Sequence, residues 1–187
     1  AMTLAYNAKG ELFAGGGGII YKISSEGKVS IFCRTGVSKM VLGPDGAFYA
    51  VDWGNTISSD IKKITPEGKV TTFATGLSHA SDIAFSPSGE LYVADPGSQK
   101  ILKVNANGTI TTIAAGLWTD PVALLFDKQG NLFVSGERVG RTDILVDMGL
   151  YKISLVDGSI TPVVLAPNIT IPNGMVIDDE GNIYGVA

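Results

Sequence analysis

Ile83-Ala-Phe-Ser-Pro-Ser-Gly-Glu-Leu-Tyr92 is the stretch that decides the fold, because its pattern occurs five times in 187 residues. Each copy has a short apolar segment, a polar turn that ends in Gly, and a second apolar segment with an aromatic residue. The other copies run from Leu4 to Phe13, Met40 to Tyr49, Leu124 to Phe133 and Met175 to Tyr184. The five turn glycines lie 36, 43, 41 and 51 residues apart, at Gly10, Gly46, Gly89, Gly130 and Gly181. Repetition at this spacing is typical of propeller blades.

Each repeat continues with two further apolar segments that a second Gly turn joins. The clearest examples run from Ile61 to Phe73 and from Ile101 to Ile113. Alternation such as Lys69-Val-Thr-Thr-Phe73 indicates half-buried antiparallel strands, and the Glu-Gly and Asn-Gly pairs indicate hairpin turns. Four short strands in every repeat predict an all-β fold, a β-propeller of four-stranded antiparallel blades. A generic β-sandwich is the alternative, but a sandwich does not require self-similar units.

The repeats predict a single propeller domain over residues 1–187. Its repeats cover residues 3–39, 40–81, 82–122, 123–173 and, in part, 174–187, which is four full blades and half of a fifth. A propeller must close, since an open end leaves a sheet edge unpaired. We therefore expect the chain to be part of a six-bladed ring in a longer protein. The alternative is a homo-oligomer in which the ring is completed between chains.

Composition excludes several classes of protein. Lys and Arg number 14 against 18 Asp and Glu, so no broad basic surface is expected for nucleic acid. With 45% apolar and 17% charged residues, the composition is the reverse of a disordered one. No run approaches the roughly 18 apolar residues that span a bilayer, and no signal peptide is evident. We expect neither a nucleic acid nor a membrane partner, and the compartment stays open because a single Cys33 does not decide it.

Two sets of connections are expected at one face of the blades. In a propeller, the loop from one blade to the next and the loop between the second and third strands open on the same side, where ligands bind. The first set covers residues 35–39, 75–82, 115–122 and 166–174. The second set covers residues 15–18, 52–60, 95–99 and 135–148.

These loops predict an acidic, oxygen-rich face. Such a face suits a hard divalent cation, Ca²⁺ before Mg²⁺ or another divalent ion. Its side chains are Asp52, Trp53, Asp60, His79, Asp82, Asp95, Trp118, Asp120, Glu137, Arg138, Arg141, Asp143, Asp147 and Asn173.

Each of these residues also has an ordinary structural interpretation. Asp52 and Asp95 occupy repeated positions, where an Asp more often caps a turn than binds a ligand. His79 can be a loop histidine with no chemical role. Trp53 and Trp118 can stack on a sugar or aromatic ligand, or fill the gap between blades. The insertion from Glu137 to Met148 breaks the repeat length and is a candidate lid or specificity loop.

The repeats also resemble known propellers. Pro172-Asn-Gly-Met-Val-Ile-Asp-Asp-Glu-Gly-Asn-Ile-Tyr184 is similar to the repeat of the gluconolactonase and senescence-marker-protein family of six-bladed propellers. Ser81 to Asp95 and Lys100-Ile-Leu-Lys-Val104 look equally like NHL-repeat propellers. The resemblance covers essentially the whole chain, and its motifs are chiefly structural.

The resemblance implies one divalent cation, usually Ca²⁺, held by a Glu, two Asn and an Asp at strand starts. Asn173 matches one of these positions, and Asp82 lies one residue from another. The first-blade Glu position falls at Met2. The remaining strand starts carry Ser38, Ser81 and Val122, which depart from the pattern.

Three functional hypotheses follow. The first is a metal-dependent hydrolase of a lactone or small ester, with Asn173 and Asp82 as metal ligands and Asp95 or His79 as the base. The second is a non-catalytic propeller that binds a protein, peptide or glycan on the same face. The third is an inactive part of a longer chain. The expected ligand contacts of this face are Trp53, Trp118, Asp120, Glu137, Arg138 and Arg141.

Overall fold

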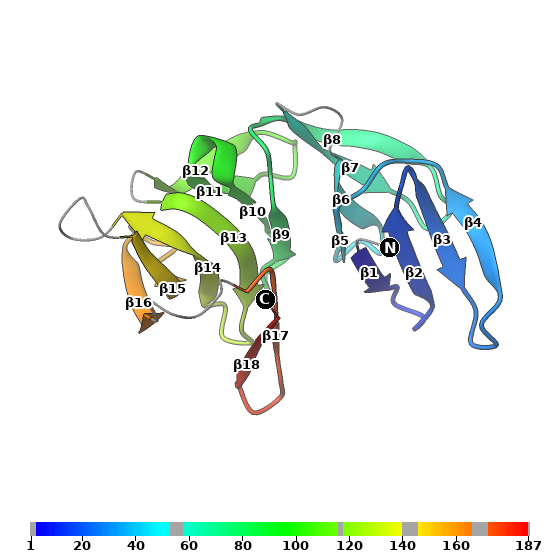
Figure 1. Cartoon of the computed structure of the whole chain (residues 1–187). Helices are drawn as coiled ribbons and strands as arrows, with labels where there is room; N and C mark the ends of the chain where they lie inside the picture. The colour runs from blue at the N-terminus through cyan, green and yellow to red at the C-terminus, as the bar shows by residue number, and fades with distance from the viewer. Residues whose placement is uncertain (1–2, 53–57, 116–117, 140–145, 166–171, 187) are drawn as a thin grey trace. The chain divides into compact units, whose positions relative to one another are not determined.

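A computed structural model describes residues 3–52, 58–115, 118–139, 146–165 and 172–186 (Figure 1). The chain divides into two compact units, Ala1–His79 and Ala80–Ala187. The division falls close to the predicted boundary between the second and third repeats. Each unit is described by itself.

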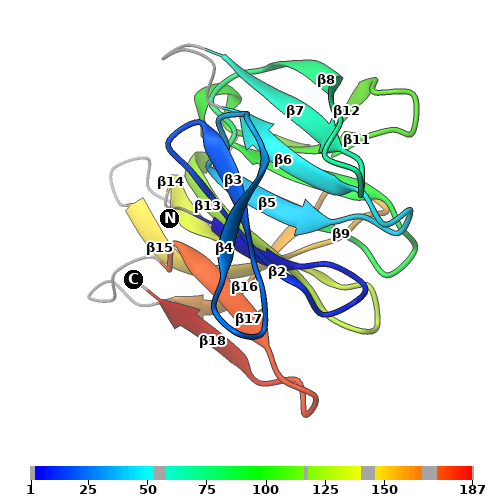
Figure 2. The ribbon, with the colours of Figure 1, turned by 90° about the vertical axis from the view of Figure 1, so that its right-hand side faces the viewer.

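The first unit holds two four-stranded antiparallel sheets, which we call blades 1 and 2 (Figure 2). Blade 1 has the strand order β1-β2-β3-β4, from β1 (Thr3–Tyr6), β2 (Leu12–Gly16), β3 (Ile19–Ile23) and β4 (Val29–Cys33). Blade 2 has the order β5-β6-β7-β8, from β5 (Lys39–Leu42), β6 (Phe48–Asp52), β7 (Ser59–Ile64) and β8 (Val70–Leu77).

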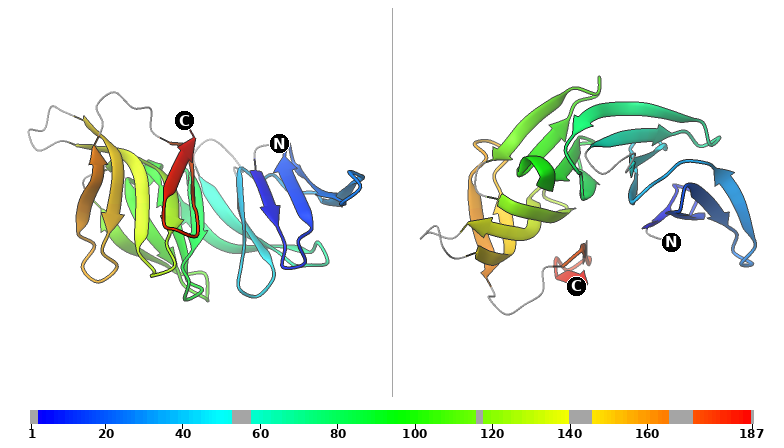
Figure 3. Two further views of the ribbon diagram at one scale, coloured as in Figure 1. Left: turned by 90° about the horizontal axis from the view of Figure 1, so that it is seen from below. Right: turned by 45° about the horizontal axis from the view of Figure 1, so that its top comes forward.

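The second unit holds blades 3 and 4 and a two-stranded hairpin (Figure 3). Blade 3 consists of β9 (Asp82–Phe85), β10 (Leu91–Asp95), β11 (Lys100–Val104) and β12 (Ile110–Ala115), with the 3-10 turn η1 (Pro96–Ser98) between β10 and β11. Blade 4 consists of β13 (Trp118–Phe126), β14 (Leu132–Val139), β15 (Val146–Ile153) and β16 (Ile160–Leu165). The final hairpin consists of β17 (Gly174–Ile177) and β18 (Ile183–Val186).

In three of the five repeats, one side chain at the start of the polar turn fixes its form. In Asp127-Lys-Gln-Gly-Asn131, Asp127 Oδ1 accepts hydrogen bonds from the backbone N–H of Gln129 at 3.0 Å and Asn131 at 2.7 Å. Asn7 and Asp178 make the same pair of bonds in blade 1 and in the final hairpin. An Asn or Asp thus fixes the turn in three of the five repeats. The other two have Gly43 and Ser86 at this position, and Ser86 Oγ accepts a hydrogen bond from Glu90 N–H at 3.1 Å.

Blades within a unit pack through aromatic and aliphatic side chains that the strand alternation directs to one face. In the first unit, the ring of Phe13 lies 4.9 Å from that of Phe48 in the next blade. In the second unit, Tyr92 of blade 3 lies 5.1 Å from Phe126 of blade 4. Face-to-face packing of successive sheets is what the propeller prediction requires.

Several segments predicted as loops are strands. Residues 118–122 belong to β13, residues 75–77 to β8, and residues 137–139 and 146–148 extend β14 and β15. The 137–148 insertion lengthens both strands of one hairpin, and their ladder continues through Glu137–Met148 and Val139–Val146 pairs. β13 pairs with β14 along its whole length, from Trp118 to Phe126, with two irregularities in register, so β13 is also long. Backbone pairing therefore makes the described part of this insertion an extended hairpin. Residues 140–145 lie outside the described residues, and a lid or specificity loop here stays a prediction.

The described residues confirm the fold class: all-β, with four-stranded antiparallel blades, four of them followed by half a blade. In these parts of the chain the one helical segment is the three-residue η1, so none of their helices is long or apolar enough to cross a bilayer.

Candidate functional site

The start of the first strand and the end of the second strand meet at one end of every sheet, which we call the entry end. In blade 3, Asp82 pairs with Ala94, so Asp82 and Asp95 lie at that end. In blade 4, the pairing of Asp120 with Glu137 places both at the same end, and Asn173 directly precedes β17. Most of the predicted site residues of the second unit therefore lie at entry ends.

Asp82 is buried, and both of its carboxylate oxygens accept backbone hydrogen bonds. Oδ1 accepts from its neighbour Ile83 at 2.8 Å, and Oδ2 accepts from Leu124 N–H of blade 4 at 2.9 Å. Thr3 holds the equivalent position in blade 1, and its Oγ1 accepts from Met40 N–H of blade 2 at 3.1 Å. The side chain at this position thus links one blade to the next, a role that sequence reasoning missed.

Asp95 is also buried, at the end of β10. Its Oδ2 accepts a hydrogen bond from Ser98 Oγ at 2.8 Å, across η1. The repeat partner Asp52 is half-buried, with its Oδ2 3.6 Å from Lys62 Nζ. Within blade 3 the Asp95 carboxylate is held at the point where the chain leaves the sheet. This position stabilises the turn and also places a carboxylate at the entry end.

Asn173 is exposed, and its backbone is fixed. Its N–H donates to Val186 O at 2.8 Å, as Ser38 N–H donates to Val51 O and Ser81 N–H to Ala94 O, both at 3.0 Å. The preceding residue is anchored as well, because buried Ser135 donates from Oγ to Pro172 O at 2.8 Å. The exposed Asn173 side chain therefore starts from a backbone position that hydrogen bonds hold in place.

The remaining predicted contacts divide between described and undescribed residues. Asp120 is exposed and Glu137 is half-buried, and they oppose each other across β13 and β14. Trp118 pairs with Arg138 in the same ladder, but only their backbones belong to the described residues. Trp53 and Arg141 lie outside the described residues.

His79 belongs to the first unit and is exposed. Its φ of 74° is in the left-handed region, which costs a non-glycine residue energy. Strain of this kind is found at functional sites.

The chemistry of the entry-end donors suits a hard cation, because they are carboxylate and amide oxygens. Their arrangement is less favourable. The described residues include no group of three or more His, Cys, Asp and Glu side chains that could hold a metal. Asp82 could coordinate a cation only by giving up one of its backbone hydrogen bonds, so Asn173 is the more accessible donor.

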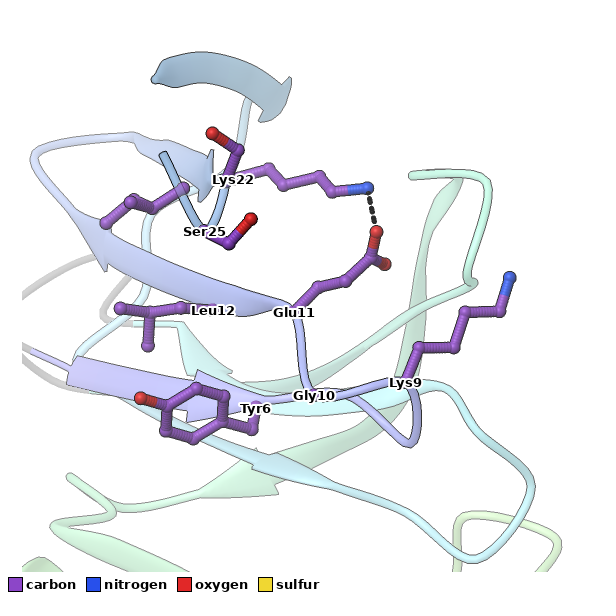
Figure 4. A pocket seen from close by; sticks show the side chains of 9 residues that line it. Tyr6, Lys9, Gly10, Glu11, Leu12, Lys22 and Ser25 are labelled. Carbon is purple, nitrogen blue, oxygen red and sulfur yellow. Dashed lines mark ion pairs between the residues drawn. The ribbon is translucent and has the colours of Figure 1, made fainter. Parts of the chain in front are cut away.

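A pocket that the sequence did not reveal lies on blade 1 (Figure 4). Its volume is about 580 Å³. Lys22 Nζ and Glu11 Oε1 form an ion pair of 2.6 Å at its side, and this hydrogen bond, with a second from Asn7, lowers the pKa of Glu11. The lining residues are Tyr6, Lys9, Gly10, Glu11, Leu12, Lys22, Ile23, Ser24 and Ser25.

No protein-family model matches the chain, and a search of curated proteins finds no match. Solved structures do resemble it. A gluconolactonase from Xanthomonas campestris matches 97% of this chain with a TM-score of 0.73 and 17% identity. Virginiamycin B lyase from Staphylococcus aureus matches 99% with a TM-score of 0.77 and 15% identity. The PQQ-bound aldose sugar dehydrogenase of Streptomyces coelicolor matches 92% with a TM-score of 0.67 and 17% identity.

The shared fold is a propeller. At these identities the likeness shows the fold alone, since proteins with three different activities share it. The chain spans 68% of the gluconolactonase, 62% of the lyase and 70% of the dehydrogenase.

Proposed function

We propose that this chain is a gluconolactonase-like propeller that binds a small lactone or ester at its entry ends and hydrolyses it. The observation that carries the proposal is Asn173, an exposed amide on a fixed backbone at the strand start where the resembling family places a ligand. The likeness in fold to a gluconolactonase supports the proposal.

Calcium is the proposed cofactor, with Asn173 as a ligand and Asp82 as a second one. Such a cation would polarise the substrate carbonyl as a Lewis acid. Asp95 would hold the proton of the attacking water, because its carboxylate is positioned at the same entry end by Ser98. His79 is the alternative base.

Thermal unfolding with EDTA and then with Ca²⁺ tests the cation. A ligand that binds only the folded state at a hundred times its Kd adds about 2.7 kcal/mol, which raises the unfolding midpoint measurably. Asn173→Ala should abolish that rise. Asn182→Ala is the matched control, because Asn182 is an exposed Asn of the same hairpin that bonds only within its turn, to Asp178.

Hydrolysis is tested separately with a series of lactones and aryl esters. We expect activity that needs Ca²⁺ and is lost in Asp95→Asn. A chain that responds to no divalent cation and hydrolyses none of the series would refute the hydrolase proposal.

A non-catalytic binding module is the second candidate, and one observation favours it. Asp82 uses Oδ2 to connect blade 3 to blade 4, as Thr3 connects blades 1 and 2 with its hydroxyl, and its Oδ1 accepts from Ile83 N–H of its own strand, so a structural need explains Asp82 without a metal. In that case chelation changes nothing. A protein, peptide or glycan ligand would bind through the blade 4 hairpin and Trp118, and Trp118→Ala would weaken it.

A further inference from the structure

Two Asn-Gly pairs lie among the described residues, Asn107-Gly108 and Asn173-Gly174. Asn followed by Gly is the pair in which the next backbone nitrogen reaches the side-chain amide carbon most readily, because Gly has no Cβ to obstruct the approach. The product is a cyclic imide, and water then opens it to aspartate or isoaspartate. Whether a folded protein allows this reaction depends on how the backbone around the pair is held.

Asn107 lies in a turn that is outside the strand ladder of blade 3. β11 ends at Val104 and β12 begins at Ile110, so residues 105–109 connect the two strands. Asn107 is exposed, and blade 3 has all four of its strands. Water and hydroxide therefore reach the side-chain amide in the folded chain, and this exposure does not depend on a missing part of the blade.

Local hydrogen bonds restrain the attacking nitrogen and the amide. Gly108 N–H donates to Asn105 O at 2.8 Å, and Asn105 N–H donates to Thr109 O at 2.8 Å. Asn107 Oδ1 accepts from Thr109 N–H at 3.1 Å and from Thr109 Oγ1 at 2.7 Å. All of these bonds lie within one turn, so the turn can open while the blade stays folded. Opening frees the Gly108 nitrogen and lets the Asn107 side chain rotate towards it.

Asn173-Gly174 is held more firmly, because a strand begins there. Asn173 N–H donates to Val186 O at 2.8 Å, and Gly174 is the first residue of β17 and pairs with Val186. The preceding Pro172 carbonyl accepts from Ser135 Oγ at 2.8 Å. Attack on the Asn173 amide would disturb the strand pairing at the start of the hairpin, so we expect Asn107 to react first.

The turn of blade 3 can accommodate the aspartate product. In blade 4 the equivalent pair is Asp157-Gly158, and Asp157 Oδ1 accepts from Ser159 N–H at 3.0 Å. This bond matches the one from Thr109 N–H to Asn107 Oδ1. Aspartate therefore keeps the turn and adds one negative charge, whereas isoaspartate lengthens the backbone by one methylene group and disturbs the turn.

We infer that Asn107 is a site of spontaneous modification, converted through opening of its turn. The Gly108 nitrogen loses its proton to water or hydroxide and forms a bond to Cγ of Asn107. The Cγ–Nδ2 bond then breaks, and the departing nitrogen takes up a proton and leaves as ammonia. Water adds to one of the two imide carbonyl carbons and opens the ring to aspartate or isoaspartate. The reaction needs no enzyme or cofactor, so the converted fraction records the age of the folded chain.

Peptide mapping by mass spectrometry tests the site after the folded chain has stood for days at neutral and at mildly alkaline pH. Aspartate and isoaspartate should accumulate at position 107, faster at alkaline pH because the attacking nitrogen must lose a proton. Isoaspartyl methyltransferase, used as a reagent, identifies the isoaspartate. Asn105 is the internal control, because it lies in the same turn but is followed by Ala106. Asn173 should convert several times more slowly than Asn107.

Ala106→Pro tests the role of turn opening. Blade 2 has Pro66 at this position, and its turn closes with the same two backbone bonds, at 2.8 and 3.0 Å. Pro should therefore fit the turn, restrict its opening and slow the conversion of Asn107 about twofold to fivefold. Ser25→Pro makes the same change in the equivalent turn of blade 1, and as the matched control it should leave the rate unchanged. In urea, where the turn is lost, Ala106→Pro and the wild type should convert at similar rates.

Three results overturn the inference. The first is an intact Asn107 in the folded chain over a period in which the chain in urea is converted. The second is conversion of Asn173 at the same rate as Asn107 or faster. The third is an unchanged rate in Ala106→Pro, which would mean that opening of the turn does not control the reaction.

Discussion

At the scale of single residues, the position of a side chain in the repeat helps to distinguish a structural role from a chemical one. Asp82 is a proposed metal ligand, because a carboxylate at a strand start suits a hard cation. Its place in the repeat is also that of Thr3, and both side chains accept a hydrogen bond from the next blade. A hydroxyl accepts this bond as a carboxylate does, so the link between blades does not require the charge.

Substitution of Asp82 tests that conclusion. Asp82→Ala leaves Leu124 N–H buried without its acceptor and should cost about 1–3 kcal/mol of unfolding free energy. Asp82→Thr restores the acceptor found in blade 1 and should recover a measurable part of that loss. Urea unfolding of both variants is the measurement. Equal losses in the two variants would mean that the carboxylate itself is required.

His79 is tested through its backbone. Because its φ is 74°, His79→Gly should be more stable than His79→Ala by about 1 kcal/mol, the left-handed penalty of a residue with Cβ. Lactone or ester hydrolysis measured on the same pair tests the proposed base. Loss of activity in both supports a catalytic His79, whereas two active variants leave strain as its only consequence.

At the scale of elements, the sequence predicts strands and turns where they depend on residues close together in the chain. The turns with Gly at the end, three of which are Asx-type, depend on residues a few positions apart, and all five predicted hairpins are present among the described strands. The extended β13 and β14 were missed because their pairing joins Trp118 to Arg138, a long-range register that composition does not show. The blade 1 pocket could not be predicted either, since it depends on which sheet face is covered.

The turn glycines predict a graded series. Gly27, Gly68 and Gly158 all have positive φ, near 70 to 85°, so substitution by Ala costs each about 1 kcal/mol of backbone strain. The Cβ of Gly158→Ala would also strike a backbone oxygen at 2.3 Å, and that of Gly68→Ala would approach one at 3.0 Å. Destabilisation should therefore increase from Gly27 to Gly68 to Gly158.

Chemical unfolding measures the series. Gly27→Ala is the internal control for backbone strain, because its Cβ meets no described atom. Equal costs at the three positions would show that blades adjust freely to one another, contrary to the close packing of protein interiors.

At the scale of the whole molecule, the propeller scaffold does not select a chemistry. Gluconolactonase, lyase and dehydrogenase structures share it, so function has to be argued from the side chains at the entry ends. There the chain combines a displayed amide, a buried carboxylate and a long hairpin in blade 4. Other acidic groups accept hydrogen bonds in turns or form ion pairs on strand faces, and they determine how the stability of the fold changes with pH.

Acid stability should reflect hydrogen-bonded carboxylates. Lys103 lowers the pKa of Glu90, and Ser154 with Ser159 lowers the pKa of Asp157 to about 2. A lowered folded-state pKa gives stability that is present above the unfolded values of 4.5 and 3.8 and is lost as pH falls through the folded values. The unfolding midpoint should therefore be level above about pH 5 and fall towards pH 2, and Asp157→Asn should make that fall shallower.

Alkaline stability should depend on Tyr92, with the opposite sign. Burial first, and then the neighbouring Glu90 carboxylate, raise the pKa of Tyr92 to about 12 from 10.0. The unfolded chain loses this proton before the folded chain does, so stability is complete below pH 10 and declines as pH rises to 12. Tyr92→Phe removes the titrating group while keeping the ring against Phe126, and its unfolding midpoint should fall less over that interval. Tyrosinate absorbance during the titration supplies the independent measurement, and an unchanged alkaline decline in Tyr92→Phe would assign it to another group.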